Sequence, residues 1–168
     1  MPAATAIRRC TANERDTVLE IINAAATAYR NVIPADCWNE PYMPRAELDH
    51  EISAGVEFWG YQQGAQLAGA MGIQSVRDVH LIRHAYVRPE YQRCGIGAAL
   101  LQHLCRLSTQ RLLVGTWAAA TWAIEFYRRH GFTRLDAPTA APLLKSYWSI
   151  PQRQLESSVV LVFDGVLA

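Results

Sequence analysis

The sequence predicts a single-domain α/β (α+β) fold whose sheet is mixed and mostly antiparallel. Strand patterns and helix patterns alternate along the chain, and residues 56–61 and 67–76 flank Gln63-Gly64 as the two arms of a β-hairpin. The helix pattern over residues 95–108 lies between two strand patterns, as in one parallel βαβ crossover. A chain of 168 residues is long enough for one sizeable core, so we expect one domain over residues 1–168.

The composition is that of a globular protein and excludes several classes of function. Hydrophobic residues make up 51% of the chain and charged residues 18%, with a formal net charge of +1. This weak charge gives no overall field for nucleic acid or an anionic membrane, so we expect neither as a partner. The longest uncharged run, residues 58–76, is interrupted by glutamines and glycines and is not a membrane span. The four cysteines, at 10, 37, 94 and 105, have neither zinc spacing nor a clear disulfide pattern, so we expect no metal and a reducing cytoplasm.

The N-terminal third predicts a strand, a helix, a loop and a second helix. Residues 6–10 form the strand, and Thr11-x-x-Glu14 has the spacing of a capping box before the first helix. Residues 30–44 contain three prolines and several aromatic residues, which predicts an ordered loop of defined conformation with a short helical turn. These aromatic side chains either bind a ligand or pin the loop to the core, and pinning is the simpler interpretation. Pro44 then begins a helix that ends at Gly55.

The rest of the chain is divided by apolar runs and by turn residues. We expect a loop over residues 136–142, which are rich in alanine and proline, and residues 145–150 are a candidate for one more strand. The other predicted elements are strands over residues 79–87, 112–117, 132–135 and 157–163, and helices over residues 95–108 and 118–130.

The stretch from Val87 to Leu101 is the most informative part of the sequence. A strand end is followed by Pro89, by two glycines and by an apolar helical stripe, so a loop leads into a helix N-terminus. The unpaired N–H groups and the positive dipole end of that helix suit a phosphate or pyrophosphate. A dinucleotide fingerprint would need a third glycine where Leu100 stands, and the Gly-Lys-Ser/Thr of a P-loop is missing. The stretch predicts an anionic ligand, and the alternative is an ordinary glycine-containing turn before a core helix.

Two motifs together point to a family. Gln92-x-x-Gly95-x-Gly97 resembles the pyrophosphate-binding signature of the GCN5-related N-acetyltransferase (GNAT) superfamily. Ala123-x-x-Phe126-Tyr127-x-x-x-Gly131-Phe132 resembles the helix that lies beside the acyl thioester in that superfamily. The resemblance covers residues 7–135, and residues 147–154 look similar to an uncharacterised branch. It implies six to seven strands with helices on both faces, and a splayed parallel pair of strands that admits the pantetheine arm.

The resemblance implies an acetyl-CoA-dependent N-acetyltransferase. The acetyl group would pass directly from the thioester to a primary amine, carried by a small molecule or by a peptide, with acetyl-CoA as cosubstrate and no metal. The implied cofactor-binding residues are Ala85, Tyr86, Val87, Gln92, Arg93, Cys94, Gly95, Ile96, Gly97 and Ala98.

Tyr127 falls at the superfamily's general-acid position beside the sulfur. A phenol of pKa about 10 is a weaker acid than a thiol of pKa about 8.5, so we expect Tyr127 to stabilise the leaving thiolate by a hydrogen bond. The alternative is that Phe126-Tyr127 is an aromatic pair that packs the helix onto the sheet.

The general base is not identified by a motif. Many relatives have a glutamate where Leu81 stands, and His84 or His80 could replace it because imidazole titrates near neutrality. These histidines are four apart in a predicted strand, so we expect them on one face, about 13 Å from each other. Glu57 from the neighbouring strand, or ordered water, is a further alternative.

Two departures from the superfamily pattern favour a rival function. Besides Leu81, the chain has Ala120 where many relatives have an asparagine that bonds the pantetheine arm. The rival is a non-catalytic acyl-CoA-binding regulatory module, and a third hypothesis is an acyl donor other than acetyl-CoA. The acceptor and the oligomeric state, a homodimer included, are open.

Overall fold

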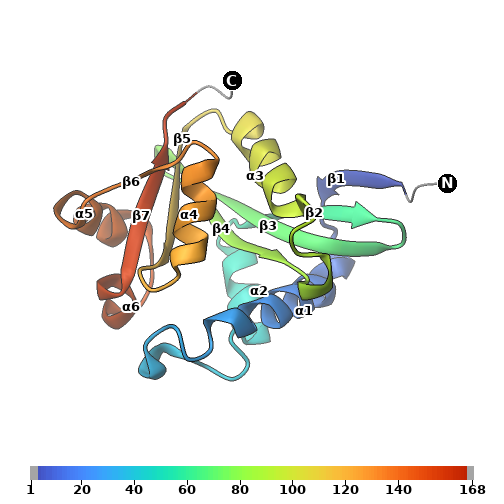
Figure 1. Cartoon of the computed structure of the whole chain (residues 1–168), viewed down its shortest axis with the longest axis horizontal. Helices are drawn as coiled ribbons and strands as arrows, with labels where there is room; N and C mark the ends of the chain where they lie inside the picture. Colours follow the sequence, from blue (N-terminus) through green and yellow to red (C-terminus); the bar gives the residue numbers. More distant parts are fainter. Residues whose placement is uncertain (1–3, 166–168) are drawn as a thin grey trace.

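The computed structural model describes residues 4–165, so the first three and last three residues of the domain predicted over residues 1–168 lie outside it. Figure 1 shows one central sheet, and its seven strands lie in the order β1-β2-β3-β4-β5-β7-β6. The strands are β1 (Thr5–Arg9), β2 (Glu57–Gln63), β3 (Gln66–Val76), β4 (Val79–Val87), β5 (Arg111–Trp117), β6 (Thr133–Arg134) and β7 (Ser158–Phe163). The helices are α1 (Arg15–Ala26), α2 (Arg45–Ser53), α3 (Ile96–Leu107), α4 (Thr121–Arg129), α5 (Ala137–Tyr147) and α6 (Gln152–Glu156), with 3-10 turns η1 (Ala12–Glu14), η2 (Thr27–Tyr29), η3 (Ala35–Cys37) and η4 (Pro89–Tyr91).

The sheet confirms the predicted fold class. β4 and β5 form a parallel pair with α3 as the crossover between them, and the other paired strands run antiparallel. β2 and β3 form the predicted hairpin, with Gln63 opposite Gln66 at its turn.

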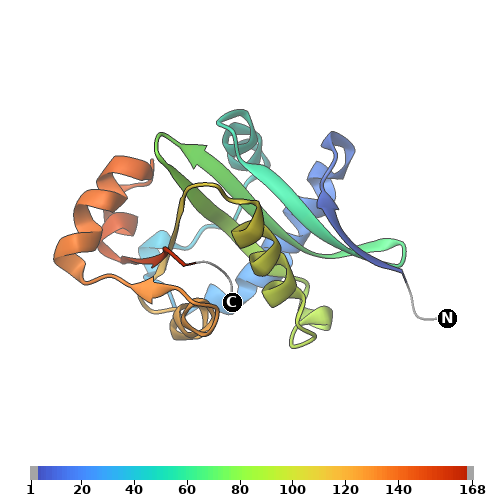
Figure 2. The same ribbon diagram turned by 90° about the horizontal axis from the view of Figure 1, so that it is seen from above.

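Two apolar cores lie on opposite faces of the sheet, because alternate strand side chains point to opposite sides. On one face, Leu100 and Leu104 of α3 and Ile124 of α4 pack against Ile82 of β4. On the other face, α1 and α2 cover β2 and β3, while α5 covers β5 and β7. Figure 2 shows the two layers of helices from above. Leu100 and Leu104 are fully buried, so truncating either to alanine would cost about 2–5 kcal/mol.

The parallel pair separates halfway along its length. Pairing of β4 with β5 ends at Ile82 opposite Val114, and the two strands continue apart. A bulge lies just beyond that point, where β4 places both His84 and Ala85 in the interval that β3 spans with one residue. His84 has a φ of 51°, in the left-handed region that non-glycine residues rarely adopt. The bulge shifts the alternation of β4, so the side chains after it change face relative to a regular strand.

The segment between β6 and β7 differs from the prediction. The loop predicted over residues 136–142 and the strand candidate over residues 145–150 are both wrong, because α5 occupies most of this segment. Asp136 caps α5 by accepting the Thr139 N–H at 2.9 Å, and the proline of its first turn replaces an N–H that would have no partner within the helix. Pro142 inside the helix destabilises it, but the free energy gained by burying Leu144 against β5 and β7 outweighs this cost.

The loop over residues 30–44 is pinned to the core, as predicted. Met43 is buried, and the Asn23 side chain of α1 both accepts its N–H at 2.8 Å and donates to its carbonyl at 3.0 Å. Tyr42 and Trp38 pack against each other with ring centroids 5.6 Å apart. The loop therefore has a fixed position over the end of the parallel pair.

Candidate active site

A cavity of about 640 Å³ opens where β4 and β5 separate. Its walls come from both strands beyond their last shared pair, from α1 and η2, from the start of α3, from α4, and from α5 and the residues that follow it. Because residues of both sheet faces line it, the cavity runs through the gap in the sheet. The residues predicted from the sequence that line it are His84, Ala85, Tyr86, Val87, Gln92, Arg93, Gly97 and Tyr127.

The predicted anion-binding loop lies at one end of this cavity. Gln92 Nε2 donates to the Val87 carbonyl at 3.1 Å and so ties the loop to the end of β4. Gly95 is the N-cap of α3 with a φ of 78°, a conformation that glycine adopts without strain. The first N–H groups of α3 have no partner within the helix, so they can bind an anion. The other predicted cofactor residues, Cys94, Gly95, Ile96 and Ala98, belong to this loop and first turn.

The space around Gly97 shows whether the anion-binding loop and the first turn of α3, here called the cradle, can accept a ligand. A Cβ added there would lie 3.5 Å and 3.6 Å from ring atoms of Phe126 and 3.7 Å from Cγ2 of Val87, which are ordinary van der Waals distances. The fold itself therefore has room for a side chain at this position. Glycine leaves the first turn of α3 open toward the cavity, and the superfamily signature has either glycine or alanine at this position, so a small residue suits a pyrophosphate here.

Tyr127 lies on the α4 side of the cavity and is 5% exposed. Its ring packs edge-on against Phe126, with centroids 5.2 Å apart, and against Phe132, at 5.5 Å. Burial raises the pKa of the Tyr127 hydroxyl well above its usual value of 10, so at neutral pH the group is a hydrogen-bond donor. Tyr127 thus packs the helix onto the sheet and also faces the cavity.

His84 lies on the opposite wall and is held by a carboxylate. Its Nε2 is hydrogen-bonded to Oε2 of Glu51 on α2, and Arg83 Nη2 donates to Oε1 of the same carboxylate at 3.0 Å. The Arg83, His84 and Glu51 side chains are only 15%, 14% and 13% exposed. Burial alone would raise the Glu51 pKa, but the hydrogen bond to His84 and the nearby cations outweigh it and lower that pKa. Because Glu51 is ionised, Nε2 of His84 carries the hydrogen and Nδ1 is the nitrogen that can accept a proton.

The other candidate bases lie outside the cavity wall. His80 Nδ1 is 2.6 Å from Ser108 Oγ, on the α3 side of the sheet, so the prediction that His80 and His84 share a face is wrong. The bulge at His84 is the reason, because it shifts the alternation between the two histidines. Glu57 is half-exposed and pairs with Arg9 at 2.7 Å. Leu81, where many relatives have a glutamate, is fully buried beneath α5, where a carboxylate would lose its hydration.

Aromatic side chains line the cavity between the loop and the strand ends. Trp117 Nε1 donates to Tyr42 Oη at 3.0 Å, which fastens the loop to β5. Tyr29 of η2 stacks on Trp122 of α4 with centroids 5.7 Å apart and meets Tyr86 edge-on at 6.2 Å. Burial raises the pKa of Tyr29 to about 12, so its hydroxyl stays neutral. Tyr42 therefore both pins the loop to β5 and lines the cavity, while ligand binding by the aromatic side chains of the loop stays a prediction.

Several of these residues are missed by reasoning from sequence. Glu51 is three residues after Leu48, whose side chain is fully buried, so a charged residue near the inward face of α2 was an available signal. Its partner His84 is 33 positions away, and only the fold brings the two together. Ala120 is buried as the N-cap of α4 beside Trp117.

The four cysteines are free thiols. Burial raises the pKa of Cys10 and of Cys105 to about 11, whereas Cys94 is exposed in the anion-binding loop. Among residues 4–165, no three His, Cys, Asp or Glu side chains gather as ligands for a metal ion. Within the same described range, none of the helices is long and apolar enough to cross a bilayer.

Known proteins resemble this chain in sequence. A family model described as "Acetyltransferase (GNAT) domain" matches residues 54–134. An uncharacterized N-acetyltransferase of Escherichia coli, YedL, is 31% identical over 84 residues, which is 46% of this chain and 53% of YedL. The chain thus spans about half the length of that relative. The peptidyl-lysine N-acetyltransferase YiaC of E. coli is 25% identical over 152 residues, covering 87% of this chain and 98% of YiaC.

A solved structure resembles the fold. The PaiA N-acetyltransferase of Thermoplasma acidophilum, crystallised in complex with coenzyme A, has a TM-score of 0.71 and 17% sequence identity. The match covers 95% of this chain and 98% of that one. At this level of identity the likeness concerns the fold, and it includes almost the whole chain.

Proposed function

We propose that the chain is a member of the GCN5-related N-acetyltransferase superfamily and transfers an acetyl group from acetyl-CoA directly to a primary amine. One observation carries the proposal: a single cavity joins a glycine-bearing helix N-terminus to a histidine–carboxylate pair through the gap between β4 and β5. Coenzyme A in the T. acidophilum structure and the acetyltransferase names of the relatives support it. The free thiols suit a reducing cytoplasm as the location.

The start of α3 and the free edge of β4 would hold the cofactor. The first N–H groups of α3 and the Arg93 side chain supply positive charge for a pyrophosphate. Beyond Ile82, β4 has no β5 partner on one side, so the backbone from Ala85 to Val87 offers hydrogen-bonding groups to an extended arm. Acetyl-CoA supplies a thioester, whose carbonyl an N–H of this edge would polarise.

His84 is proposed as the general base. An alkylammonium acceptor must lose one proton before its nitrogen attacks the thioester carbon and a second one as the C–N bond is completed. Nδ1 of His84 can accept one of these protons while Nε2 donates to Glu51, which stabilises the imidazolium that forms. Arg83 keeps Glu51 ionised and in place. Solvent takes up the other proton.

Tyr127 is proposed to assist departure of the thiolate. As the C–S bond breaks, the electron pair remains on sulfur, and the Tyr127 hydroxyl stabilises it by donating a hydrogen bond. The raised pKa of Tyr127 makes early proton transfer to sulfur unfavourable, so the final proton of the free thiol comes from solvent.

Release of free thiol from acetyl-CoA tests the proposed function. The purified chain is mixed with acetyl-CoA and a panel of amines, polyamines, amino acids and lysine peptides, and each acetylated product is identified by mass spectrometry. We expect amine-dependent thiol release. Binding of acetyl-CoA without turnover on any amine would instead support the regulatory module, which the departures at Leu81 and Ala120 favour. Faster turnover with a longer acyl-CoA than with acetyl-CoA would show that the preferred acyl donor is not acetyl-CoA.

Cys94 gives an independent test of the cofactor site. It is exposed in the loop, whereas Cys105 is buried and its pKa is raised to about 11. We expect iodoacetamide to modify Cys94 in the folded protein and acetyl-CoA, which has no free thiol to consume the reagent, to protect it, with Cys105 unmodified in both samples. Equal modification of Cys94 with and without saturating acetyl-CoA would contradict the proposed placement.

A further inference from the structure

We propose that the acceptor is a small amine with an apolar or aromatic substituent and no carboxylate. This inference rests on the proposed acetyl transfer and concerns the half of the same cavity that lies beyond His84. The walls of this half, their charges and the contact at its outer edge each support it.

Most of the large side chains of this half are aromatic or aliphatic, and Thr116, Gln154 and Ser158 are its uncharged polar residues. Tyr42 and Trp117 line it from the loop and β5, and Leu144, Trp148 and Ile150 line it from α5 and the residues that follow. Trp148 is pressed against β5 at the separation, because a Cβ added to Gly115 would lie 3.2 Å from its indole ring. When an acceptor moves from water into this space, burial of its apolar surface contributes favourable binding free energy.

The charged groups of this half are already paired. Arg83 Nη1 donates to Gln74 Oε1 at 3.0 Å, and its Nη2 donates to Glu51 at 3.0 Å. Arg93 also lines the cavity, but it lies in the loop at the cofactor end. Among the described residues that line the acceptor half, therefore, none offers an uncommitted cation. A carboxylate on the acceptor would lose its hydration there without gaining an ion pair.

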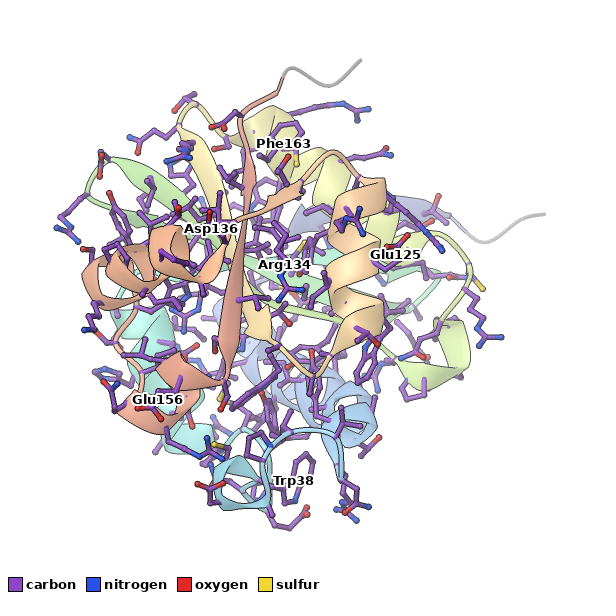
Figure 3. All side chains as sticks on the ribbon, turned by 60° about the vertical axis from the view of Figure 1, so that its left-hand side comes forward. Trp38, Glu125, Arg134, Asp136, Glu156 and Phe163 are labelled. Carbon is purple, nitrogen blue, oxygen red and sulfur yellow. The ribbon has the colours of Figure 1, made fainter. Side chains whose placement is uncertain are left out.

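An ion pair joins α6 to η3 beside this half. Arg153 of α6 donates to Asp36 of η3 at 2.9 Å, which joins two segments that are 117 positions apart. Figure 3 shows Trp38 of the loop and Glu156 of α6 at the same end of the molecule. Such an exposed pair stabilises the fold little. Because Gln154, the neighbour of Arg153, lines the cavity, we infer that the pair lies close to its outer edge, where it would hinder an extended peptide more than a small amine.

One carboxylate outside the wall does not discriminate between amines. Glu47 lies one turn before Glu51 on α2, and loss of hydration and the Glu51 charge raise its pKa. Its carboxylate would attract any ammonium ion alike. The preference for a substituent therefore comes from the apolar wall beyond it.

A matched set of acceptors tests the inference on the wild-type protein with acetyl-CoA. The set contains 2-phenylethylamine, phenylalanine, spermidine and a lysine peptide. The first two differ only by the carboxylate, so we expect kcat/KM to be at least about 100-fold higher for 2-phenylethylamine. Comparable values for this pair, or best turnover with spermidine or the peptide, would overturn the acceptor class and leave acetyl transfer standing. Thiol release with none of the amines would overturn both.

A charge-introducing variant gives a second test. Ile150→Arg places a cation in the apolar wall, so we expect the preference for 2-phenylethylamine over phenylalanine to shrink at least about 10-fold. Val32→Arg is the matched control, since Val32 is 37% exposed in the loop and does not line the cavity. An unchanged preference in a folded Ile150→Arg protein, verified by its thermal unfolding, would count against this wall as the acceptor site.

Discussion

Gly97→Ala should raise the stability of the fold and leave coenzyme A binding almost unchanged. The new methyl would lie 3.5 Å from the Phe126 ring and 3.7 Å from Val87, so it packs without strain. Burying one methyl is worth up to about 0.8 kcal/mol, and alanine is favoured over glycine inside a helix by about 1 kcal/mol. Since Gly97 is in the first turn, only part of the helix term applies, and we expect a gain between zero and about 1.5 kcal/mol.

The ligand should respond little to this methyl. The signature that the chain resembles has glycine or alanine at this position, so we expect the dissociation constant for coenzyme A to change less than about 3-fold. Urea unfolding measures the first effect and calorimetric titration the second. Gly60→Ala is the control, because its Cβ would lie 2.7 Å from Leu67 in the core, which destabilises the fold but leaves coenzyme A affinity unchanged. A dissociation constant raised about 10-fold or more in Gly97→Ala would contradict the match to this signature, and marked destabilisation would refute the packing argument.

Three further predictions concern single side chains. Tyr127→Phe should lower kcat about 10-fold or more while changing acetyl-CoA affinity less than about 2-fold, and an unchanged kcat in steady-state assays would remove Tyr127 from the mechanism. Glu51→Gln removes the carboxylate that holds His84 Nε2 and would stabilise the imidazolium, so kcat/KM should fall about 10-fold or more while acetyl-CoA affinity changes less than about 2-fold; an unchanged kcat/KM would argue against His84 as base. The hydrogen bond from Arg8 lowers the Glu14 pKa from 4.5 to about 2, so its stabilisation is complete above pH 4.5 and disappears as the pH falls through about 2. Glu14→Gln should therefore lower the thermal midpoint much more at pH 7 than at pH 2, and equal losses at both pH values would contradict that linkage.

The sequence predicts most of the sheet because its signals are local. The hairpin around Gln63-Gly64 and the crossover helix follow from turn residues and apolar periodicity, which need no knowledge of distant contacts. The sequence does not predict α5, because its prolines and alanines are typical of a loop. The segment is a helix because it buries apolar side chains against β5 and β7. Tertiary packing here outweighs local preference.

The residues of the candidate site also fall into two groups, those that a local motif predicts and those that only the tertiary structure brings together. Contiguous motifs identify the loop from Gln92 to Gly97 and place Tyr127, since their residues are close in sequence. The pairing of His84 with Glu51 depends on a bulge that no local pattern predicts and on a helix 33 positions away. The prediction that His80 and His84 share a face is wrong for the same reason, because the extra residue at the bulge reverses the facing of His84 relative to a regular strand.

Because β4 and β5 pair over only part of their length, the sheet has two halves that are joined by a short ladder. Only four residue pairs join the strands, from Val79 opposite Arg111 to Ile82 opposite Val114. A small rotation about this ladder would widen or narrow the cavity with little change inside either half. Ligand in the gap would press on both halves at once, so binding energy and sheet geometry are coupled there. Hydrogen exchange at the amides of this ladder would report that coupling directly, at a distance from any atom that reacts.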